Sequence, residues 1–325
     1  MKLASKKSAS KDGELCVVSK DLKFSVSAKT VCPSLREAVE SWDAVRPELE
    51  KIYQNLNQSK ISGAFAFDQS QFMSCMPRTW LFADGSAFLH HIRLVRKARN
   101  AEIPPTLTTV PLMYQAESGA FLSPNDSISQ IDFAHGTDFE AEVGVFVQDC
   151  PFGISADQAL KKIALVTLIN DVSLRGLIPA ELEMGFGFFQ SKPNKALAPI
   201  AVTVDELGEH WKNGRLHLPL MVDLNGSSFG RANAGEMHFH FGDLIAHAAK
   251  TRSLAAGSLI GSGTVSNESG TNGYSCLVEI RMIEKIQDGV MKTPFMKVGD
   301  RVSICMNDPS GNSIFGKIDQ QIVKS

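Results

Sequence analysis

The chain has 325 residues, of which 43% are hydrophobic and 21% charged, which is ordinary for a folded globular protein of about two domains. The formal net charge is −2, so no excess of basic residues indicates a nucleic-acid partner. No run of ~18 apolar residues suggests a membrane-spanning helix, and no apolar signal core follows the first lysines. The six cysteines are scattered without a CxxC pair, which fits reduced thiols. We therefore expect a cytoplasmic protein that binds neither nucleic acid nor membrane.

The N-terminal region differs from the rest of the chain, and we predict a small domain over residues 1–75 and a larger one over residues 76–325. In the small domain, the turn at residues 11–13 is followed by an apolar stretch at residues 14–18, which predicts a hairpin with short strands. We expect this domain to contribute little to the chemistry.

A helix is predicted after the hairpin. Ser34 and Glu37 have the spacing of a capping box, and apolar residues follow at helical spacing as far as Leu56.

The larger domain is rich in predicted strands. Five segments have strand character, namely 140–147, 163–169, the region around Leu259, 277–280 and 302–305. Two segments have helical character, namely 157–161 and 243–250.

Two glutamates, Glu140 and Glu142, lie two positions apart on a predicted strand. Side chains alternate along a strand, so both glutamates share one face while Phe139, Ala141 and Val143 share the other. Like charges placed side by side are destabilising unless a cation or solvent separates them. The pair by itself fits either a cation site or a solvated edge of a sheet.

Asp171 ends the apolar strand at 163–169, where a carboxylate requires a partner because an unpaired buried charge is costly. Together with Glu140 and Glu142 it would offer only oxygen ligands, which select magnesium, manganese or calcium over zinc. A structural salt bridge between Asp171 and Arg175 is the alternative interpretation.

Four segments in this part of the chain resemble motifs that occur together, in the same order, in one protein family. They are Asp138-Phe139-Glu140-Ala141-Glu142, Asn170-Asp171-Val172-Ser173-Leu174-Arg175, Lys192 followed by Ala198-Pro199, and Gly261-Ser262-Gly263-Thr264-Val265-Ser266. In this order they resemble the ExE metal-binding strand, the N-D-x-S-x-R signature, the lysine loop and the G-S-G-T segment of the fumarylacetoacetate hydrolase family. The resemblance runs from about Met76 to the C-terminus.

The resemblance implies further roles. Family members that hydrolyse carbon–carbon bonds carry an aspartate seven residues before a catalytic histidine, and Asp84 and His91 have that spacing. Asp84 would then join Glu140, Glu142 and Asp171 as the fourth metal ligand. Glu279, in the predicted strand after the G-S-G-T segment, would orient His91. The neighbouring His90 is expected to lie away from the centre.

These roles imply how the protein would hydrolyse a β-diketo acid. A divalent ion, Mg²⁺ or Ca²⁺ with Mn²⁺ also suitable, would polarise the two carbonyl oxygens. His91 would deprotonate water, and its carboxylate partner would fix its tautomer. Lys192 and Arg175 would serve as donors to the oxyanion. The substrate-binding residues implied are Ser86, Arg175, Lys192 and Thr264.

Three departures from the family pattern concern the substrate. Ser86 stands where fumarylacetoacetases place a tyrosine, apolar residues replace polar ones in the region Ile178–Leu182, and Ala196 replaces a frequent threonine or serine. These changes put fumarylacetoacetate itself in doubt more than the type of reaction.

Two other motifs have simpler explanations. Gly226 to Gly230 matches the G-x-S-x-G pattern of serine hydrolases, but Asn225-Gly226 is a hairpin turn sequence, so Ser228 is not expected to be a nucleophile. His238 and His240 would share one face of a strand, but no third zinc ligand has a suitable spacing, so we expect a surface or hydrogen-bonded pair.

The resemblance implies a β-rich α+β fold, a mixed β-sandwich roll behind a small N-terminal β-barrel-like domain, assembled as a homodimer. The function it favours is hydrolysis of fumarylacetoacetate or a related acylpyruvate, as in tyrosine and other aromatic amino-acid breakdown. One alternative is a hydratase, decarboxylase or isomerase of a 2-oxo acid, which retention of His91 and Glu279 disfavours. Another is a metal-binding protein without catalysis.

Overall fold

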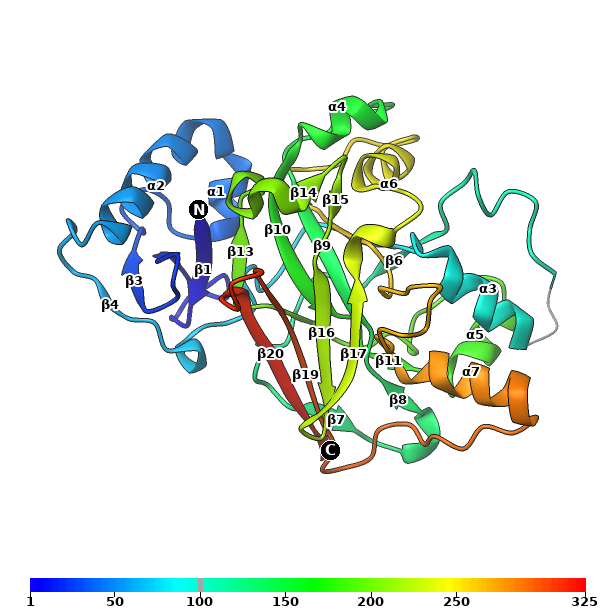
Figure 1. Cartoon of the computed structure of the whole chain (residues 1–325). Helices are drawn as coiled ribbons and strands as arrows, with labels where there is room; N and C mark the ends of the chain where they lie inside the picture. Colours follow the sequence, from blue (N-terminus) through cyan, green and yellow to red (C-terminus); the bar gives the residue numbers. More distant parts are fainter. Residues whose placement is uncertain (99–101) are drawn as a thin grey trace.

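A large mixed sheet runs through the computed structural model, which describes residues 1–98 and 102–325 (Figure 1). Its strands are, in order across the sheet, β4 (Phe65–Ala66), β3 (Phe24–Ser27), β2 (Glu14–Val18), β1 (Lys2–Lys6), β13 (Ile200–Val202), β10 (Ile163–Asn170), β9 (Ala141–Val147), β18 (Leu259–Gly261), β5 (Phe82–Gly85) and β6 (Met113–Ala116). The short strand β12 (Ala196–Leu197) completes the 11-stranded sheet by pairing with β10. Most neighbours are antiparallel, but β18 and β5 are parallel.

A second, 5-stranded sheet packs against this one. Its strands are, in order, β17 (Ser227–Asn233), β16 (Pro219–Leu224), β19 (Arg301–Asn307), β20 (Ser313–Lys324) and β7 (Ile128–Gln130). Val143 and Val166 of the large sheet and Val222, Ile304 and Ile318 of the smaller sheet belong to one buried apolar core. Burial of this apolar area is the main force that holds the two sheets together.

Two small ribbons and several helices surround the sheets. The ribbons are β8 (Thr137–Asp138) with β11 (Ser173–Leu174), and β14 (Trp211–Lys212) with β15 (Arg215–Leu216). The α-helices are α1 (Leu35–Glu40), α2 (Trp42–Asn57), α3 (Leu89–Ala98), α4 (Ala156–Leu160), α5 (Ile178–Glu183), α6 (Phe241–Ala248) and α7 (Leu277–Asp288). Short 3₁₀ turns cover Gln69–Gln71, Phe133–His135, Val204–His210 and Ala234–Glu236.

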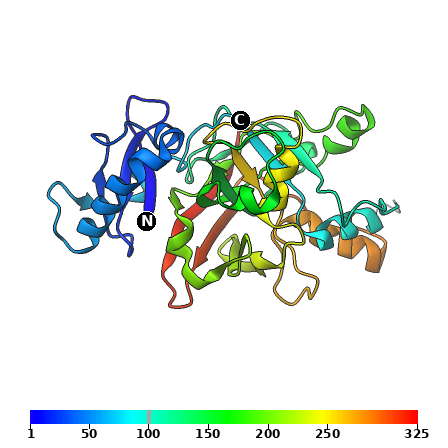
Figure 2. The same cartoon turned by 90° about the horizontal axis from the view of Figure 1, so that it is seen from above.

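Pairs of helices lie at opposite ends of the molecule, and α4 and α6 lie between them (Figure 1). Helices α1 and α2 lie beside the N-terminal strands, and α3 and α7 lie together at the opposite end (Figures 1 and 2). Among the described residues, no helix combines the length and the apolar character that crossing a bilayer demands. The β-rich α+β class expected from the sequence is confirmed.

The N-terminal strands do not form the barrel-like unit that the resemblance implied. Over residues 1–98 no closed barrel exists, because β1 pairs with β2 on one side and with β13 on the other. Lys2 is in register with Val202, so the N-terminal strands extend the large sheet instead of closing on themselves. The hairpin predicted at residues 11–13 joins β1 and β2 and is confirmed.

The alternation predicted around the two glutamates is confirmed. Phe139, Ala141 and Val143 face the core between the two sheets. Phe146 lies an even number of positions from both glutamates and so shares their face of the strand. It belongs to a second core, on the other face of the large sheet. Glu142 therefore lies on that second face.

The turn and histidine motifs have the structural roles expected for them, with one exception. Asn225 and Gly226, both at positive φ, make the turn between β16 and β17, so Ser228 lies on a hairpin strand. His238 contacts the carbonyl oxygen of Thr108 through Nε2 at 2.9 Å. His240 caps α6, so the two histidines do not share a strand as predicted. All six cysteines are unpaired.

The predicted helix after the hairpin is divided into α1 and α2 at Ser41. Ser34 caps α1 as the sequence indicated, since its hydroxyl accepts from the Glu37 amide at 3.3 Å and donates to Glu37 Oε1 at 2.8 Å. Ser41 caps α2 without any side-chain hydrogen bond.

This difference gives a matched test. Ser34→Ala should lower the free energy of unfolding by about 1 kcal/mol, because the Glu37 amide and the Glu37 carboxylate both lose their partner at the start of α1. Ser41→Ala should change it by less than about 0.5 kcal/mol. Urea unfolding followed by circular dichroism measures both, and equal losses for the two variants would contradict the assigned cap.

Candidate active site

Three buried carboxylates meet at one end of the central strands. Asp84 lies on β5, Glu142 on β9, and Asp171 directly after β10. One oxygen from each lies within 4.8 Å of the others, and none of the three side chains is more than 4% exposed. They meet because β9 runs antiparallel to both β10 and β18, and β5 runs parallel to β18. The start of β9 therefore lies beside the ends of the other strands.

The G-S-G-T segment makes this meeting possible. Strand β18 separates β5 from β9, and Gly261 on β18 is in register with Asp84. A Cβ atom at position 261 would overlap Oδ1 of Asp84. The Gly263 amide donates to the same oxygen at 3.1 Å, and Gly263 itself has a φ of 75°. Both glycines are needed for the close approach of backbone and carboxylate.

The electrostatics of this group favour a cation. Burial, and then the neighbouring Asp171, raise the pKa of Asp84 to about 8. Burial and the charges of Asp84 and Asp171 raise the pKa of Glu142 well above its usual range. Neither carboxylate oxygen of Glu142 has a hydrogen-bond partner among the described residues. Buried carboxylates that lie close together, one of them with no hydrogen-bond partner in the described part of the chain, fit a hard divalent ion, as the sequence predicted.

Glu140, the fourth predicted ligand, lies beside this group but is held differently. Its Oε1 receives Lys192 Nζ at 2.7 Å, Ser173 Oγ at 2.5 Å and an Arg175 guanidinium nitrogen at 3.1 Å, and its Oε2 accepts from Thr264. Burial alone would raise the pKa of Glu140, but Arg175 and Lys192 hold it well below its usual range. Glu140 is thus already neutralised, while Asp84 and Glu142 are not.

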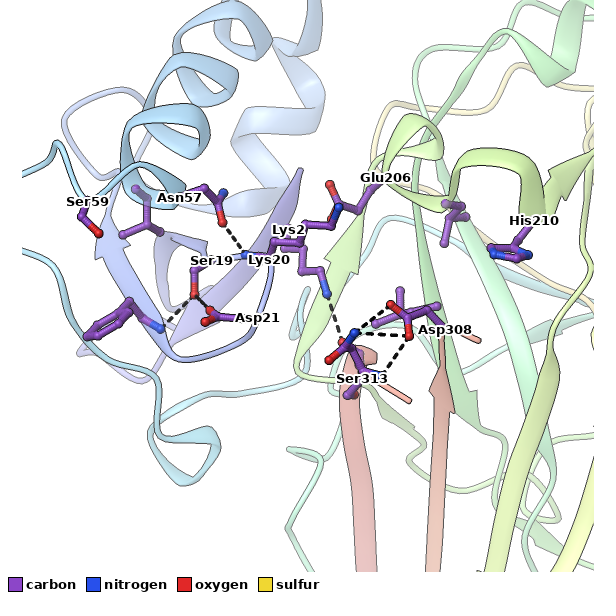
Figure 3. Close-up of a pocket in the computed structure, with 15 residues that line it drawn as sticks. Lys2, Ser19, Lys20, Asp21, Asn57, Ser59, Glu206, His210, Asp308 and Ser313 are labelled. Carbon is purple, nitrogen blue, oxygen red and sulfur yellow. Dashed lines mark hydrogen bonds between the residues drawn. The ribbon is translucent and has the colours of Figure 1, made fainter. Parts of the chain in front are cut away.

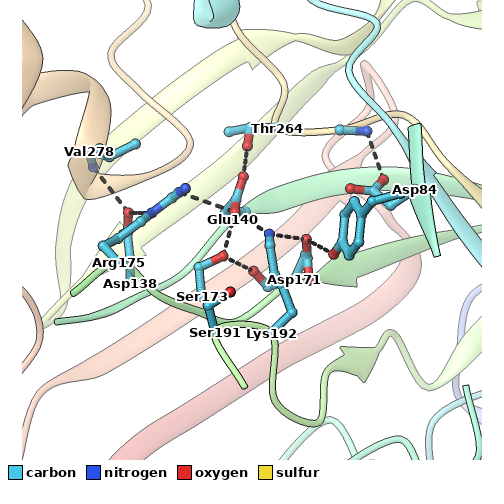
Figure 4. Close-up of polar contacts among 12 residues, drawn as sticks. Asp84, Asp138, Glu140, Asp171, Ser173, Arg175, Ser191, Lys192, Thr264 and Val278 are labelled. Carbon is cyan, nitrogen blue, oxygen red and sulfur yellow. Dashed lines mark hydrogen bonds and ion pairs between the residues drawn. The ribbon is translucent and has the colours of Figure 1, made fainter. Parts of the chain in front are cut away.

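Asp171 has partners other than the expected Arg175. Its Oδ2 receives Lys192 Nζ at 2.6 Å and the Tyr114 hydroxyl at 2.8 Å, and its Oδ1 lies 3.3 Å from Lys195 Nζ. Lys192 therefore bridges Glu140 and Asp171 (Figure 4). The alternative interpretation, a structural salt bridge between Asp171 and Arg175, is therefore wrong.

Arg175 pairs instead with Asp138, at 3.0 Å from Nε to Oδ2. The other contacts of Asp138 are the backbone amides of Leu277 and Val278 at the start of α7, at 2.8 and 3.1 Å. The carboxylate of Asp138 therefore sits at the positive end of that helix (Figure 4).

His91 and Glu279 form the predicted pair, with 2.9 Å between His91 Nδ1 and Glu279 Oε1. His91 lies on α3 and Glu279 on α7. The predicted strand at 277–280 is wrong, because these residues open the 12-residue helix α7. Four apolar-rich residues cannot distinguish strand from helix, whereas the longer stretch buries Leu277, Val278 and Met282 on one helical face.

A cavity of about 110 Å³ joins most of the predicted residues. Those that line it are Asp84, Ser86, His91, Glu140, Arg175, Lys192 and Thr264, together with Gly85, Phe88, Tyr114, Ile178, Phe188 and Gly263. Glu142, Asp171 and Glu279 lie behind this surface. His90 is not part of the lining and faces a surface groove with Arg93 and Ile283. Ala196, suspected of affecting the substrate, is buried in β12 and does not line the cavity.

Asp138, Lys195 and Tyr114 contact the charged groups of the site but were not predicted as site residues. Asp138 could have been found from the sequence, because it continues the two-residue spacing of Glu140 and Glu142. Lys195 lies three positions after Lys192, but nothing in its spacing indicates a buried ammonium. Tyr114 reaches Asp171 from the edge strand β6, a contact between distant segments that no local pattern encodes.

A larger cavity, of about 410 Å³, lies between the N-terminal strands and the turn before β20 (Figure 3). Lys2 Nζ donates to the Ser313 carbonyl at 3.1 Å, and Asn57 accepts from the Lys20 amide at 2.8 Å. Burial lowers the pKa of Lys2 to about 8. The charges here are mixed and none of the residues of the carboxylate site contributes.

Family comparisons agree with the geometry. Residues 81–323 match the model for the fumarylacetoacetate (FAA) hydrolase C-terminal region, and residues 1–78 match fumarylacetoacetase N-terminal domain 2. The chain belongs to the fumarylacetoacetate hydrolase family. The resemblance inferred from the four motifs is confirmed, and members of this family are hydrolases and isomerases, some of which bind divalent metal ions.

Individual relatives are distant. The chain is 28% identical over 162 residues to the 2,4-didehydro-3-deoxy-L-rhamnonate hydrolase of Sphingomonas sp. (strain SKA58), a match that covers 49% of this chain and 54% of that protein. Thus the chain spans about half the length of the curated relatives it matches.

Solved structures share the fold over the whole chain. Maleylpyruvate hydrolase from Sphingobium sp. SYK-6, solved with manganese(II) and pyruvate, has a TM-score of 0.67 at 14% identity, with 100% of both chains covered. The 2-hydroxyhepta-2,4-diene-1,7-dioate isomerase from Mycobacterium marinum has a TM-score of 0.62 at 16% identity, covering 100% of this chain and 99% of that one.

The raised carboxylate pKa values predict how stability depends on pH. Without a divalent ion, the folded protein should keep a proton on Asp84 that the unfolded chain has released between pH 3.8 and about 8, the ordinary and folded pKa values of Asp84. Its free energy of unfolding should therefore fall as the pH rises through this window. Mg²⁺ at about 100 times the Kd that it has at about pH 8 should restore about 2.7 kcal/mol at that pH, and the same Mg²⁺ concentration should restore less at about pH 6.

Glu142→Gln removes one of the repelling charges, so this variant without metal should be more stable than the wild type at about pH 8. Its stabilisation by Mg²⁺ should be lost. Glu48→Gln, an exposed position on α2, is the matched control and should behave as the wild type does. Thermal unfolding with and without Mg²⁺ measures this, and undiminished Mg²⁺ stabilisation of Glu142→Gln would show that Glu142 is not a ligand.

Proposed function

We propose that this protein is a divalent-cation-dependent hydrolase that cleaves a carbon–carbon bond in a β-diketo acid, either fumarylacetoacetate or a related acylpyruvate. One observation carries the proposal: a histidine–carboxylate pair opens on the same cavity as a cluster of oxygen ligands. His91 lines the cavity beside Asp84 and Glu140, and Glu279 holds its Nδ1 from behind. A base and a cation site on one small cavity suit attack of water on a carbonyl group.

The cation would be Mg²⁺, Ca²⁺ or Mn²⁺, held by Asp84, Glu142 and Asp171 with Glu140 adjacent. When bound, it supplies Lewis-acid polarisation of the substrate's carbonyl oxygens. Glu140 would need to change its contacts with Lys192 or Thr264 to become a direct ligand, because both of its oxygens are already in use.

His91 would act as the general base. With Nδ1 held by Glu279, Nε2 is the ring nitrogen left to take a proton from water. Glu279 is 1% exposed, so its charge faces little competition from solvent and stabilises the imidazolium that forms. The same histidine would later return the proton to the leaving carbon.

Lys192 and Arg175 would balance the negative charge that develops on the substrate. Both cations line the cavity. Burial by itself would lower the pKa of Lys192, but the nearby carboxylates of Asp171 and Glu140 outweigh it and hold that pKa above the usual value, so Lys192 stays protonated. Donors fixed in place before the reaction stabilise an oxyanion without further reorganisation.

Isomerisation of a 2-oxo acid is the second candidate, since structures of isomerases share this fold. It requires proton transfer between carbon atoms but no water. The small cavity and the oriented His91 suit water activation better, so we favour hydrolysis.

A substrate panel tests the proposal. Fumarylacetoacetate and a series of acylpyruvates should lose their diketone absorbance only when Mg²⁺, Mn²⁺ or Ca²⁺ is present, and a chelator should abolish the loss. The products should be two acids, which chromatography identifies. A single isomeric product would instead support the second candidate.

The roles of His91 and Glu279 can be separated from those of the ligands. His91→Ala should lower kcat by roughly 10²–10⁴, the usual effect of losing a general base. Glu279→Gln should also be impaired, and the double variant should be little worse than His91→Ala, because a base and its orienting group act as a unit. Mg²⁺ affinity should stay nearly unchanged in all three.

His90→Ala is the matched control for this series, since His90 precedes His91 on the same helix but faces outward. It should keep near-wild-type turnover. Loss of activity in His90→Ala with retention in His91→Ala would reverse the assignment.

A further inference from the structure

Every cation on the lining of the active-site cavity already has an anionic partner. Arg175 pairs with Asp138 and Glu140, Lys192 pairs with Glu140 and Asp171, and His91 contacts Glu279. The other charged residue of the lining is Asp84, which is acidic. Among the described residues, the lining thus has no free cation for a second carboxylate on the substrate.

Three apolar side chains, those of Phe88, Ile178 and Phe188, line the cavity, and together we call them its apolar wall. Phe88 and Ile178 are buried, at 2% and 5% exposed, and Phe188 packs edge-on against Tyr114 with ring centroids 5.0 Å apart. Lys192 Nζ lies 5.1 Å from the Tyr114 ring centre and 5.7 Å from that of Phe188. These rings flank the ammonium group but have no charge of their own to offer a substrate.

The segment that carries Ile178 and Phe188 is rich in apolar residues and has acidic but no basic residues. Residues 177–190 contain helix α5 and the following loop, and their charged residues are Glu181 and Glu183. Four of their apolar side chains are largely exposed, namely Leu182 at 43%, Met184 at 77%, Phe186 at 101% and Phe189 at 86%. An anionic group near this segment would meet like charge and apolar surface.

The loop has a defined conformation despite this exposure. The Glu181 carboxylate accepts from the amides of Phe189, Gln190 and Ser191 at 3.0, 2.5 and 3.2 Å. These bonds tie the end of the loop back to α5 and fix the position of Phe188 in between.

We propose that the substrate has an uncharged, apolar tail beyond the diketo acid, and that the site disfavours diketo acids with a second, terminal carboxylate. Of the two candidates above, this favours an acylpyruvate with an apolar acyl group over fumarylacetoacetate, which carries such a carboxylate. The inference rests on the proposed function, because that function places the diketo acid at the carboxylate cluster. The remaining tail then lies against Phe88, Ile178 and Phe188. Burial of an apolar tail there is favourable, whereas a terminal carboxylate would lose its hydration without gaining a cation.

The test compares two acylpyruvates of equal chain length, one ending in a methyl group and the other in a carboxylate. The wild type should have a kcat/KM at least about tenfold higher for the methyl-ended acid. The same pair is also measured as ligands of His91→Ala with Mg²⁺ by calorimetry, where the methyl-ended acid should bind at least about tenfold tighter. Equal or better binding and turnover of the dicarboxylate would overturn the inference.

A charge introduced into the apolar wall should reverse the preference. Phe188→Arg and Ile178→Arg each supply a cation, so the kcat/KM ratio should shift toward the dicarboxylate by about tenfold or more. Phe188 is only partly buried and tolerates the change more readily than Ile178. Phe152→Arg, at an exposed turn before α4, is the matched control and should leave the ratio unchanged.

Failure of the proposed function is distinguishable from failure of this inference. If neither acid is cleaved but His91→Ala binds the methyl-ended acid more tightly, hydrolysis is wrong and the apolar tail stands. If both are cleaved with a preference for the dicarboxylate, hydrolysis stands and the apolar tail is wrong.

Discussion

The repulsion among three buried carboxylates is the constraint on which the site depends. Asp84, Glu142 and Asp171 would separate in a flexible region, because Asp171 raises the free energy of charging Asp84, and both of these raise the free energy of charging Glu142. They stay together because hydrogen-bonded strands fix their backbones, and because Gly261 leaves room for one of them. The interactions that hold the fold therefore supply the energy that keeps the ligands close, and a bound cation would recover that energy.

The carboxylate cluster and the histidine pair are connected physically. Arg175 contacts Glu140 on one side and Asp138 on the other, and Asp138 accepts from the first amides of α7. That helix carries Glu279, which positions His91. A displacement at the cation site would thus be transmitted to the base through charge-assisted hydrogen bonds, which are among the strongest in a protein. This connection explains why Asp138 is buried although it does not line the cavity.

The sequence was informative where a local rule decides the structure. The alternation around Glu142, the hairpin at Asn225 and the cap at Ser34 each follow from the geometry of a few consecutive residues, and all three are present. Prediction failed where distant segments decide. Residues 277–280 become helical because α7 packs on α3. Strand β1 extends the large sheet because β13 pairs with β10 on one side and leaves its other side for β1. Lys195 reaches Asp171 for the same non-local reason.

The rigid and the variable parts of the site carry different tasks. The carboxylates lie on or next to strands of the large sheet, and the base and its partner on helices, so their geometry is strongly determined. The tail wall depends partly on the loop after α5, where Gly185 and Gly187 have positive φ and nothing crowds either position. Of the three departures from the family pattern, Ser86 and Ile178 line the cavity, whereas Ala196 packs inside the sheet. The departures that can contact the substrate are therefore Ile178, on the wall that would meet the tail, and Ser86, the residue after β5. A family with this division can change its substrate by replacing wall residues while the cation site and the base stay in place.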